Sequence, residues 1–190
     1  MPRQVDHRQR RAQITDAVLR IAARRGLGDV TMSEVAAEAG VSKGRVQHYF
    51  GSKERLLLHT GRRLRERVGA RLLPESPRDG ALPVLTRLLH AVLPTAEEAR
   101  VDALAGKALF SVALGMPELR EEYRRGTAEL RGLLADLLVK AGGAAEDADR
   151  HAAALLGLTE YLSDALLLEE TTAPEARRRL DAQIAEFLDR

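Results

Sequence analysis

The chain has 190 residues, of which 45% are hydrophobic and 31% are charged, a composition typical of a folded protein rather than a disordered one. It contains no cysteine, which excludes disulfides, cysteine-ligated zinc and thiol catalysis. The amino end carries charge without a following apolar stretch, so we expect no signal peptide. The apolar run from Ala152 to Leu168 is interrupted by Glu160 and Asp164 and is too short to span a bilayer. These exclusions predict a cytoplasmic protein with no membrane partner.

The net charge of +2 conceals an asymmetry between the two ends of the chain. Residues 1–73 contain 16 Lys and Arg against 7 Asp and Glu, a net +9, whereas residues 74–190 contain 14 against 21, a net −7. Such an asymmetry is typical of a polyanion-binding end attached to a different module. The alternative is that the basic residues only solvate helix faces, and charge by itself favours neither interpretation.

Helical periodicity and capping signals predict an all-α fold of about nine helices. The first runs over about 9–25 and ends at Gly26. A capping box from Thr31 to Glu34 opens a short second helix that stops at Gly40. Ser42 caps a third helix to about Tyr49, and Ser52 caps a long fourth one to about Leu73.

Downstream, capping boxes at Thr95–Glu98 and Thr172–Glu175, a proline at 117 and the pair Gly142–Gly143 bound the remaining helices. We expect these helices near residues 81–93, 96–114, 117–141, 147–169 and 173–189. The proline-containing stretch 74–83 is the predicted linker. No segment shows the alternation of a strand.

Residues 31–50 predict a helix-turn-helix, in which two short helices are joined by a glycine-containing turn. Small apolar residues on the first helix allow close packing, and apolar residues of the second are expected to face the same core: Val35, Ala36 and Ala39, then Val41, Val46 and Phe50. The remaining residues of the second helix are expected to face outward: Lys43, Gly44, Arg45, Gln47, His48 and Tyr49.

The chemistry of the outward residues suits a DNA duplex. Arg45 can pair with guanine O6 and N7, and Gln47 with adenine N6 and N7. Gly44 permits close approach of the backbone, and phosphate contacts are expected at helix starts. The predicted DNA-binding set is Thr31, Ser42, Lys43, Gly44, Arg45, Gln47, His48, Tyr49 and Lys53.

The stretch from Gly40 to Leu56, Gly-Val-Ser-Lys-Gly-Arg-Val-Gln-His-Tyr-Phe-Gly-Ser-Lys-Glu-Arg-Leu, resembles the signature of TetR-type repressors. The resemblance is specific over about residues 9–60. It implies a homodimer with a DNA-binding domain over residues 1–55 and a ligand-binding and dimerisation domain over 56–190. It also implies a palindromic operator that a small-molecule effector releases. Arg45 stands where the family often has Thr or Ser, and Gln47 where Tyr is frequent, so both are predicted to set operator specificity. The residues here look most like the BetI-like branch.

A second motif overlaps the same turn. Gly40-Val-Ser42-Lys-Gly44 matches the G-x-S-x-G elbow of hydrolases, which needs a strand before the serine and a helix after it. A predicted helix precedes this serine, so we expect the hydrolase interpretation to fail.

The helix predicted over 147–169 is apolar on nearly every face and must be covered on all sides. We expect one side to pack on the subunit core and the other on a second copy, together with helix 173–189. The alternative is a monomer with a thick core. The predicted dimer contacts are Leu155, Leu158, Leu162, Leu166, Leu180 and Ile184.

An effector site is expected among polar and aromatic residues with apolar neighbours. The candidates are His90, Phe110, Met116, Tyr123, Thr159, Glu160 and Ser163. Ordinary core packing is the alternative for each of them. Together these features predict a ligand-responsive DNA-binding regulator without catalytic residues, metal or cofactor. Its partners are double-stranded DNA, a second copy and an effector of unknown identity. The alternatives are a helical interaction module or a helical hydrolase.

Overall fold

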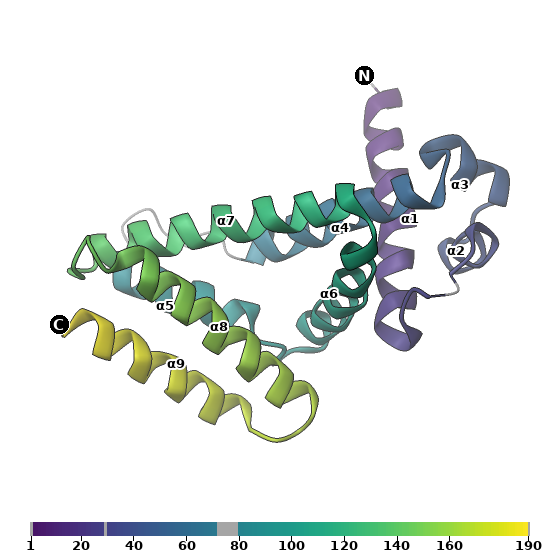
Figure 1. The fold of residues 1–190 in the computed structure, drawn as a ribbon. Helices are drawn as coiled ribbons and strands as arrows, with labels where there is room; N and C mark the ends of the chain where they lie inside the picture. The colour runs from purple at the N-terminus through teal and green to yellow at the C-terminus, as the bar shows by residue number, and fades with distance from the viewer. Residues whose placement is uncertain (1, 29, 72–79, 190) are drawn as a thin grey trace. The chain divides into compact units, whose positions relative to one another are not determined.

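A computed structural model describes residues 2–28, 30–71 and 80–189, with side chains from residue 7 onward. In these ranges all regular secondary structure is α-helical, which confirms the predicted all-α fold (Figure 1). The helices in chain order are α1 (Pro2–Arg25), α2 (Met32–Ala39), α3 (Lys43–Phe50), α4 (Lys53–Arg71), α5 (Ala81–Val92), α6 (Glu97–Gly115), α7 (Pro117–Lys140), α8 (Ala148–Leu167) and α9 (Ala173–Leu188). None of the described helices combines the length and hydrophobicity that a membrane span requires.

Of the three predicted capping boxes, the one at Thr31–Glu34 forms in full and the one at Thr172–Glu175 forms only the bond from the Glu175 amide to the threonine hydroxyl. Thr31 Oγ1 accepts a hydrogen bond from the Glu34 amide at 3.2 Å, and the Glu34 carboxylate accepts one from the Thr31 amide at 2.8 Å. Thr172 Oγ1 accepts from the Glu175 amide at 3.4 Å. The capping box predicted at Thr95 is wrong, because α6 begins at Glu97 and its cap position is therefore Ala96, one residue after the threonine. A turn in which the Thr95 amide donates to the Leu93 carbonyl holds this threonine outside the cap position.

Packing divides the chain into two compact units. Unit 1 comprises residues 1–67 and 101–124, and unit 2 comprises residues 68–100 and 125–190. The predicted boundary after residue 55 does not coincide with this division, because Leu56 and Leu57 of α4 and Leu109 of α6 belong to the same core as α1 to α3. The predicted linker at 74–83 falls largely on residues 72–79, outside the described ranges.

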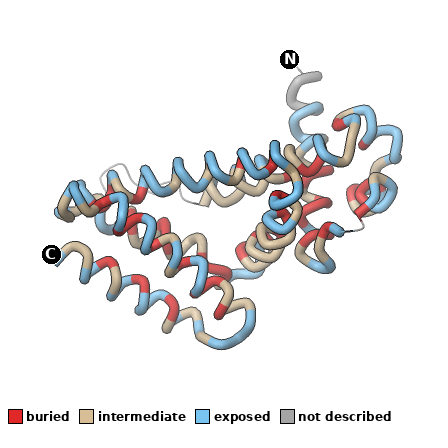
Figure 2. The backbone as a smooth tube through the Cα atoms, viewed as in Figure 1, coloured by how far each residue is buried: buried red, intermediate tan, exposed pale blue. Residues whose placement is uncertain are grey.

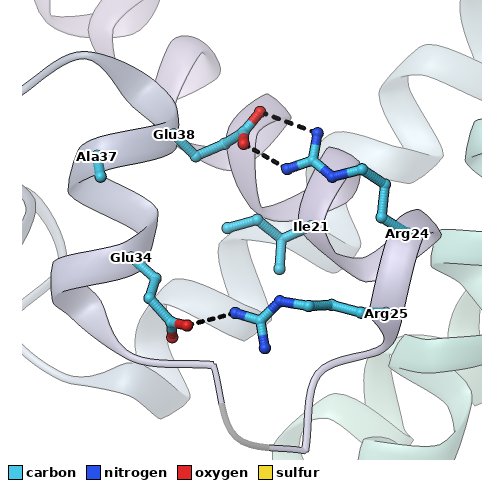
Figure 3. A pocket seen from close by; sticks show the side chains of 6 residues that line it. All are labelled: Ile21, Arg24, Arg25, Glu34, Ala37 and Glu38. Carbon is cyan, nitrogen blue, oxygen red and sulfur yellow. Dashed lines mark hydrogen bonds and ion pairs between the residues drawn. The ribbon is translucent and has the colours of Figure 1, made fainter.

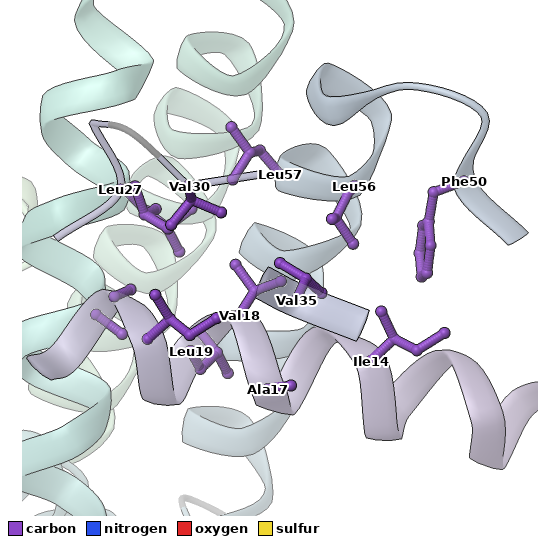
Figure 4. Packing of buried hydrophobic residues seen from close by; sticks show 14 of the residues in the cluster. Ile14, Ala17, Val18, Leu19, Leu27, Val30, Val35, Phe50, Leu56 and Leu57 are labelled. Carbon is purple, nitrogen blue, oxygen red and sulfur yellow. The ribbon is translucent and has the colours of Figure 1, made fainter. Parts of the chain in front are cut away.

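The core of unit 1 forms around α1. Ile14, Val18 and Leu19 have no exposed surface and meet Val35 of α2 and Leu56 of α4 (Figure 4). Each such side chain contributes roughly 1.5–3 kcal/mol through removal from water. This core fixes α2 and α3 against one face of α1.

Unit 2 is a helical bundle with a leucine-rich core. Leu89 of α5, Leu134 of α7, Leu155 of α8 and Leu180 of α9 are all buried in one cluster. The helices α8 and α9 lie side by side (Figure 1). Buried and exposed residues fall on opposite sides of α9, as its amphipathic sequence requires (Figure 2).

Candidate nucleic-acid interface

The reversal between α2 and α3 depends on Gly40. Its φ of 65° lies in the left-handed region, which costs an ordinary residue roughly 1–2 kcal/mol. In this conformation the Val41 amide donates to the Ala36 carbonyl at 2.9 Å and the Gly40 amide to the Ala37 carbonyl at 3.2 Å. These bonds satisfy the end of α2 and allow α3 to begin at Lys43.

The inner faces of α2 and α3 are as the sequence predicts. Val35, Ala36 and Ala39 on α2 and Val46 and Phe50 on α3 are buried. Val41, which is predicted to face the same core, is half-buried and packs against it. Because the buried residues of α3 are four apart, they occupy one side of the helix and leave the other side to solvent.

The outer face of α3 presents most of the predicted reading residues. The side chains of Lys43, Arg45, Gln47 and His48 are exposed, as is Gly44. Neither Lys43 nor Arg45 has an ion-pair partner among the described residues. Their charges are therefore available to an external anion, and the planar group of Arg45 suits a base edge.

Ser42 is exposed and serves as the cap of α3. Its Oγ accepts a hydrogen bond from the Arg45 amide at 3.2 Å. Helix α2, and not a strand, precedes it, so the overlapping G-x-S-x-G pattern has none of the strand support that a nucleophile elbow needs.

Three further predicted contacts lie at the edges of this face. Thr31 is exposed at the start of α2, although its hydroxyl is engaged in the capping box. Tyr49 is half-buried, and its ring makes edge contacts with His48 at 5.5 Å and His7 at 5.7 Å. Lys53 begins α4, with its Nζ 3.5 Å from the Gly28 carbonyl oxygen. All nine predicted DNA-binding positions thus lie in α2 to α4 of unit 1 or immediately before these helices, and their contacts with DNA remain a prediction.

An ionic clamp that the sequence pattern did not predict joins α1 to α2 (Figure 3). Glu38 accepts hydrogen bonds from Arg24 and, at 2.7 Å, from Arg20, while Glu34 accepts one from Arg25 at 2.5 Å. The bonds from Arg24 and Arg20 lower the pKa of Glu38. The pKa of Glu34 is lowered mainly by its backbone bond to Thr31.

The clamp encloses a shallow hollow of about 350 Å³ with Ile21 at its side (Figure 3). Since the charges at its rim are paired with one another, we assign it a structural role. The signal in the sequence was the spacing of four, which places Arg20 and Arg24 on one face of α1 and Glu34 and Glu38 on one face of α2.

Gln13 is a second residue whose role the sequence pattern did not predict. Its Nε2 donates to the Ala39 carbonyl at 2.7 Å, across 26 residues of sequence. The bond supports the last turn of α2 from α1. No local pattern marks this glutamine for that contact.

The predicted effector residues fall into both compact units. In unit 1, Phe110 is half-exposed and its ring lies 5.8 Å from Tyr123, whose hydroxyl donates to the Gly106 carbonyl at 2.8 Å. Met116 packs against the unit 1 core. The Tyr123 hydroxyl therefore has a hydrogen-bond acceptor within the protein, and its position does not require a ligand.

In unit 2, Thr159 and Ser163 are buried one turn apart on α8. Thr159 donates to the Leu155 carbonyl at 2.7 Å, and Glu160 is exposed and does not share this buried face. His90 Nε2 lies 2.8 Å from Asp181. The effector site stays a prediction.

The predicted dimer contacts separate into two groups. Leu155, Leu162, Leu180 and Ile184 are buried in the core of unit 2, so they have no free surface to offer a partner. Leu158 and Leu166 are half-buried. The outward register of α8 instead carries small and aromatic residues, and Tyr161 is 56% exposed. Dimerisation therefore stays a prediction. Its contact surface would be the outward side of α8, next to the side that carries the buried leucines.

Comparison with known proteins agrees with this geometry. Residues 14–60 match the family model described as bacterial regulatory proteins of the tetR family, a range that contains α2 and α3. The transcriptional regulator PksA of Bacillus subtilis is 36% identical over 100 residues, which cover 52% of this chain and 48% of PksA. The regulator BetI of Agrobacterium fabrum is 45% identical over 75 residues, covering 37% of this chain and 36% of BetI. The chain thus matches about half or less of the length of these curated relatives, and the BetI-like branch remains a prediction.

Solved structures match over nearly the whole chain. A transcriptional regulator from Rhodococcus sp. Rha1 superposes with a TM-score of 0.85 at 27% identity, covering 94% of this chain and 96% of the other. A TetR-family regulator from Rhodococcus sp. superposes with a TM-score of 0.86 at 28% identity, covering 95% and 99%. The family model, the helix-turn-helix and these structures agree: residues 14–60 are similar to the tetR family of bacterial regulatory proteins, and the fold of the chain is similar to that of these solved transcriptional regulators.

Proposed function

We propose that this protein is a transcriptional regulator that inserts α3 into the major groove of an operator. The observation that carries the proposal is the outer face of α3, where Arg45 and Gln47 are exposed on a helix whose opposite face is buried. Arginine and glutamine are side chains that read guanine and adenine by paired hydrogen bonds. The excess of basic residues in 1–73 adds the non-specific attraction to phosphates on which such binding depends.

The regulator acts as a homodimer on a palindromic operator. Two copies of α3 then reach half-sites about one helical turn, roughly 34 Å, or a multiple of it apart. The outward stripe of α8 supports this proposal, because its residues are exposed or, for Leu158, half-exposed: Ala154, Gly157, Leu158, Tyr161 and, just past the helix, Leu168.

A small-molecule effector controls the protein, and binding of the effector weakens the affinity of the protein for its operator. The protein acts as a repressor, and it does so in the cytoplasm. The support is the similarity of residues 14–60 to the tetR family and of the chain to relatives that are named as transcriptional regulators. The protein acts by binding and not by catalysis. The names of the relatives support this, as do the candidate residues, whose side chains serve in caps and in packing.

The experiment is footprinting of the DNA upstream of the protein's own gene with the purified full chain. We expect one protected site with two-fold symmetry, and binding that weakens steeply as salt rises. Protection without symmetry contradicts the dimeric mode, and the absence of any protected site means that the operator is not in that region. A library of random duplexes then tests whether the protein selects any sequence at all, and the lack of selection overturns the proposal.

A further inference from the structure

A second hollow in unit 1 lies between α1 and α4, away from the clamp of Arg24 and Glu38. Its volume is about 510 Å³, within the ~300–1,000 Å³ typical of small-molecule sites. Residues of α1 and α4 line it together with one aromatic residue of α3: His7, Arg8, Arg11, Ala12, Thr15, Phe50, His59, Arg62, Arg63 and Glu66. Four of these are arginines and only one is acidic.

The four arginines differ in whether the protein already neutralises them. Arg63 donates to Asp16 at 2.9 Å and lies 3.5 Å from Glu66, and Arg62 donates to Glu122 at 2.9 Å. The guanidinium groups of Arg8 and Arg11, in contrast, have no ion pair or hydrogen bond with any residue that the structure describes. The α1 side of the hollow therefore carries two unneutralised guanidinium groups, three residues apart on one helix.

The positive charges around the hollow affect His59, which lines its wall. The pKa of His59 is lowered, first by its burial and then by the charges of Arg11, Arg62 and Arg55. Its ring packs edge-on against Phe50 with 5.5 Å between centroids. The hollow thus combines a cationic rim with a partly apolar, aromatic wall.

We propose that this hollow binds a phosphate group, with Arg8 and Arg11 as its ligands and the rings of Phe50 and His59 beside the group to which the phosphate is attached. Guanidinium groups match phosphate oxygens in charge and in paired hydrogen-bond geometry. Neither the family model nor the names of PksA and BetI assign a ligand to this part of the chain.

Two sources supply this chemistry: a free phosphorylated small molecule and a backbone phosphate of bound DNA. The volume and the aromatic wall suit the first, because a backbone contact needs only the rim. The proposal does not depend on operator recognition, since the site is complete in one unit of one chain.

The test uses the full-length protein without DNA and follows the ring signals of His59 by NMR, assigned with the variant His59→Gln. Inorganic phosphate and phenyl phosphate are the probes, and sodium chloride at equal ionic strength is the blank. We expect saturable shifts with both phosphates and none with chloride. In Arg8→Gln/Arg11→Gln the affinity for phosphate should fall at least tenfold. Arg120→Gln, an exposed arginine of the same unit outside the hollow, should leave it unchanged.

The two sources give different results. A site for a free ligand binds phenyl phosphate at least tenfold more tightly than inorganic phosphate and retains it when a duplex is added. A site for DNA shows no such preference and loses phosphate when the duplex binds. Shifts that do not saturate, or an affinity unchanged by the double substitution in a variant with a wild-type circular dichroism spectrum, overturn the proposal.

Discussion

Arg67 on α4 holds the carboxylate of Asp102 on α6, with 3.0 Å between Nε and Oδ1, and the aspartate side chain is only 2% exposed. Removing one partner of a buried pair leaves an uncompensated charge, which typically costs about 3–5 kcal/mol. Because Arg67 itself is about one-quarter exposed, we expect Arg67→Met to lower the free energy of unfolding by about 2–3 kcal/mol. Urea titration followed by circular dichroism measures this change, since the chain has no tryptophan. Arg120→Met, at an exposed position, should change stability by less than about 0.5 kcal/mol, and equal effects would contradict the buried-pair argument.

The two glycines of the helix-turn-helix should respond to alanine in opposite directions. Gly40→Ala forces a side chain into the left-handed region and should destabilise the protein by about 1–2 kcal/mol. Gly44 lies inside α3, and a Cβ added to it would meet nothing within 4 Å, so Gly44→Ala should stabilise the protein by about 0.5–1 kcal/mol. Gly44→Ala should nevertheless weaken DNA binding, because its methyl group stands on the face that meets the groove. Thermal unfolding and a gel shift, run in parallel on both variants, separate the two effects.

Alanine substitutions at Arg45 and at Lys53 should weaken DNA binding in different ways. The loss of a base-reading arginine costs about 1–3 kcal/mol of operator affinity and relaxes the preference at one base pair. The loss of a phosphate-contacting lysine weakens binding to all sequences alike and reduces the salt slope by about 1. Affinity measured on operator and scrambled duplexes at several salt concentrations distinguishes the two. If Arg45→Ala lowered both affinities equally, its assignment to base reading would be wrong.

Acid should destabilise the protein in part through His59. Folding lowers its pKa below the ordinary value of 6.5, so protons bind the unfolded chain more readily in the window between 6.5 and the lower folded value. The free energy of unfolding therefore falls as the pH is lowered through that window. We expect His59→Gln to flatten this part of the profile, measured by urea titration from about pH 7 to pH 5. Arg11→Gln should flatten it partly, since the charge of Arg11 contributes to the shift; an unchanged profile in both variants would refute the mechanism.

Gly157 on α8 offers a sharp test of the dimer surface. A side chain added there meets nothing within 4 Å in the single chain, so Gly157→Arg should leave the subunit folded. A long charged residue in the centre of the outward stripe should, however, convert the dimer to monomer in analytical ultracentrifugation. Gly132→Arg on α7 is the matched control, because this glycine is also exposed, helical and uncrowded. If both variants dissociated the dimer, or if neither did, the interface would lie elsewhere.

The sequence by itself determined the helices and the reading face of α3. Caps, left-handed glycines and residues three or four apart act within one or two turns, so Thr31, Gly40 and the buried pair Val46 and Phe50 could be identified without a structure. Where a nearby turn competed with the local signal, as at Thr95, the predicted start of the helix was wrong by one residue.

Only the tertiary structure decided which residues meet across long stretches of chain. The clamp of Glu38, the bond from Gln13 to Ala39 and the pair of Arg67 with Asp102 join residues 14 to 35 positions apart. It likewise decided that Leu155 and Leu162 fill the core of their own subunit, because an apolar helix gives no local indication of which side its neighbours cover. Such contacts depend on how helices pack, and packing is a property of the whole chain rather than of any segment.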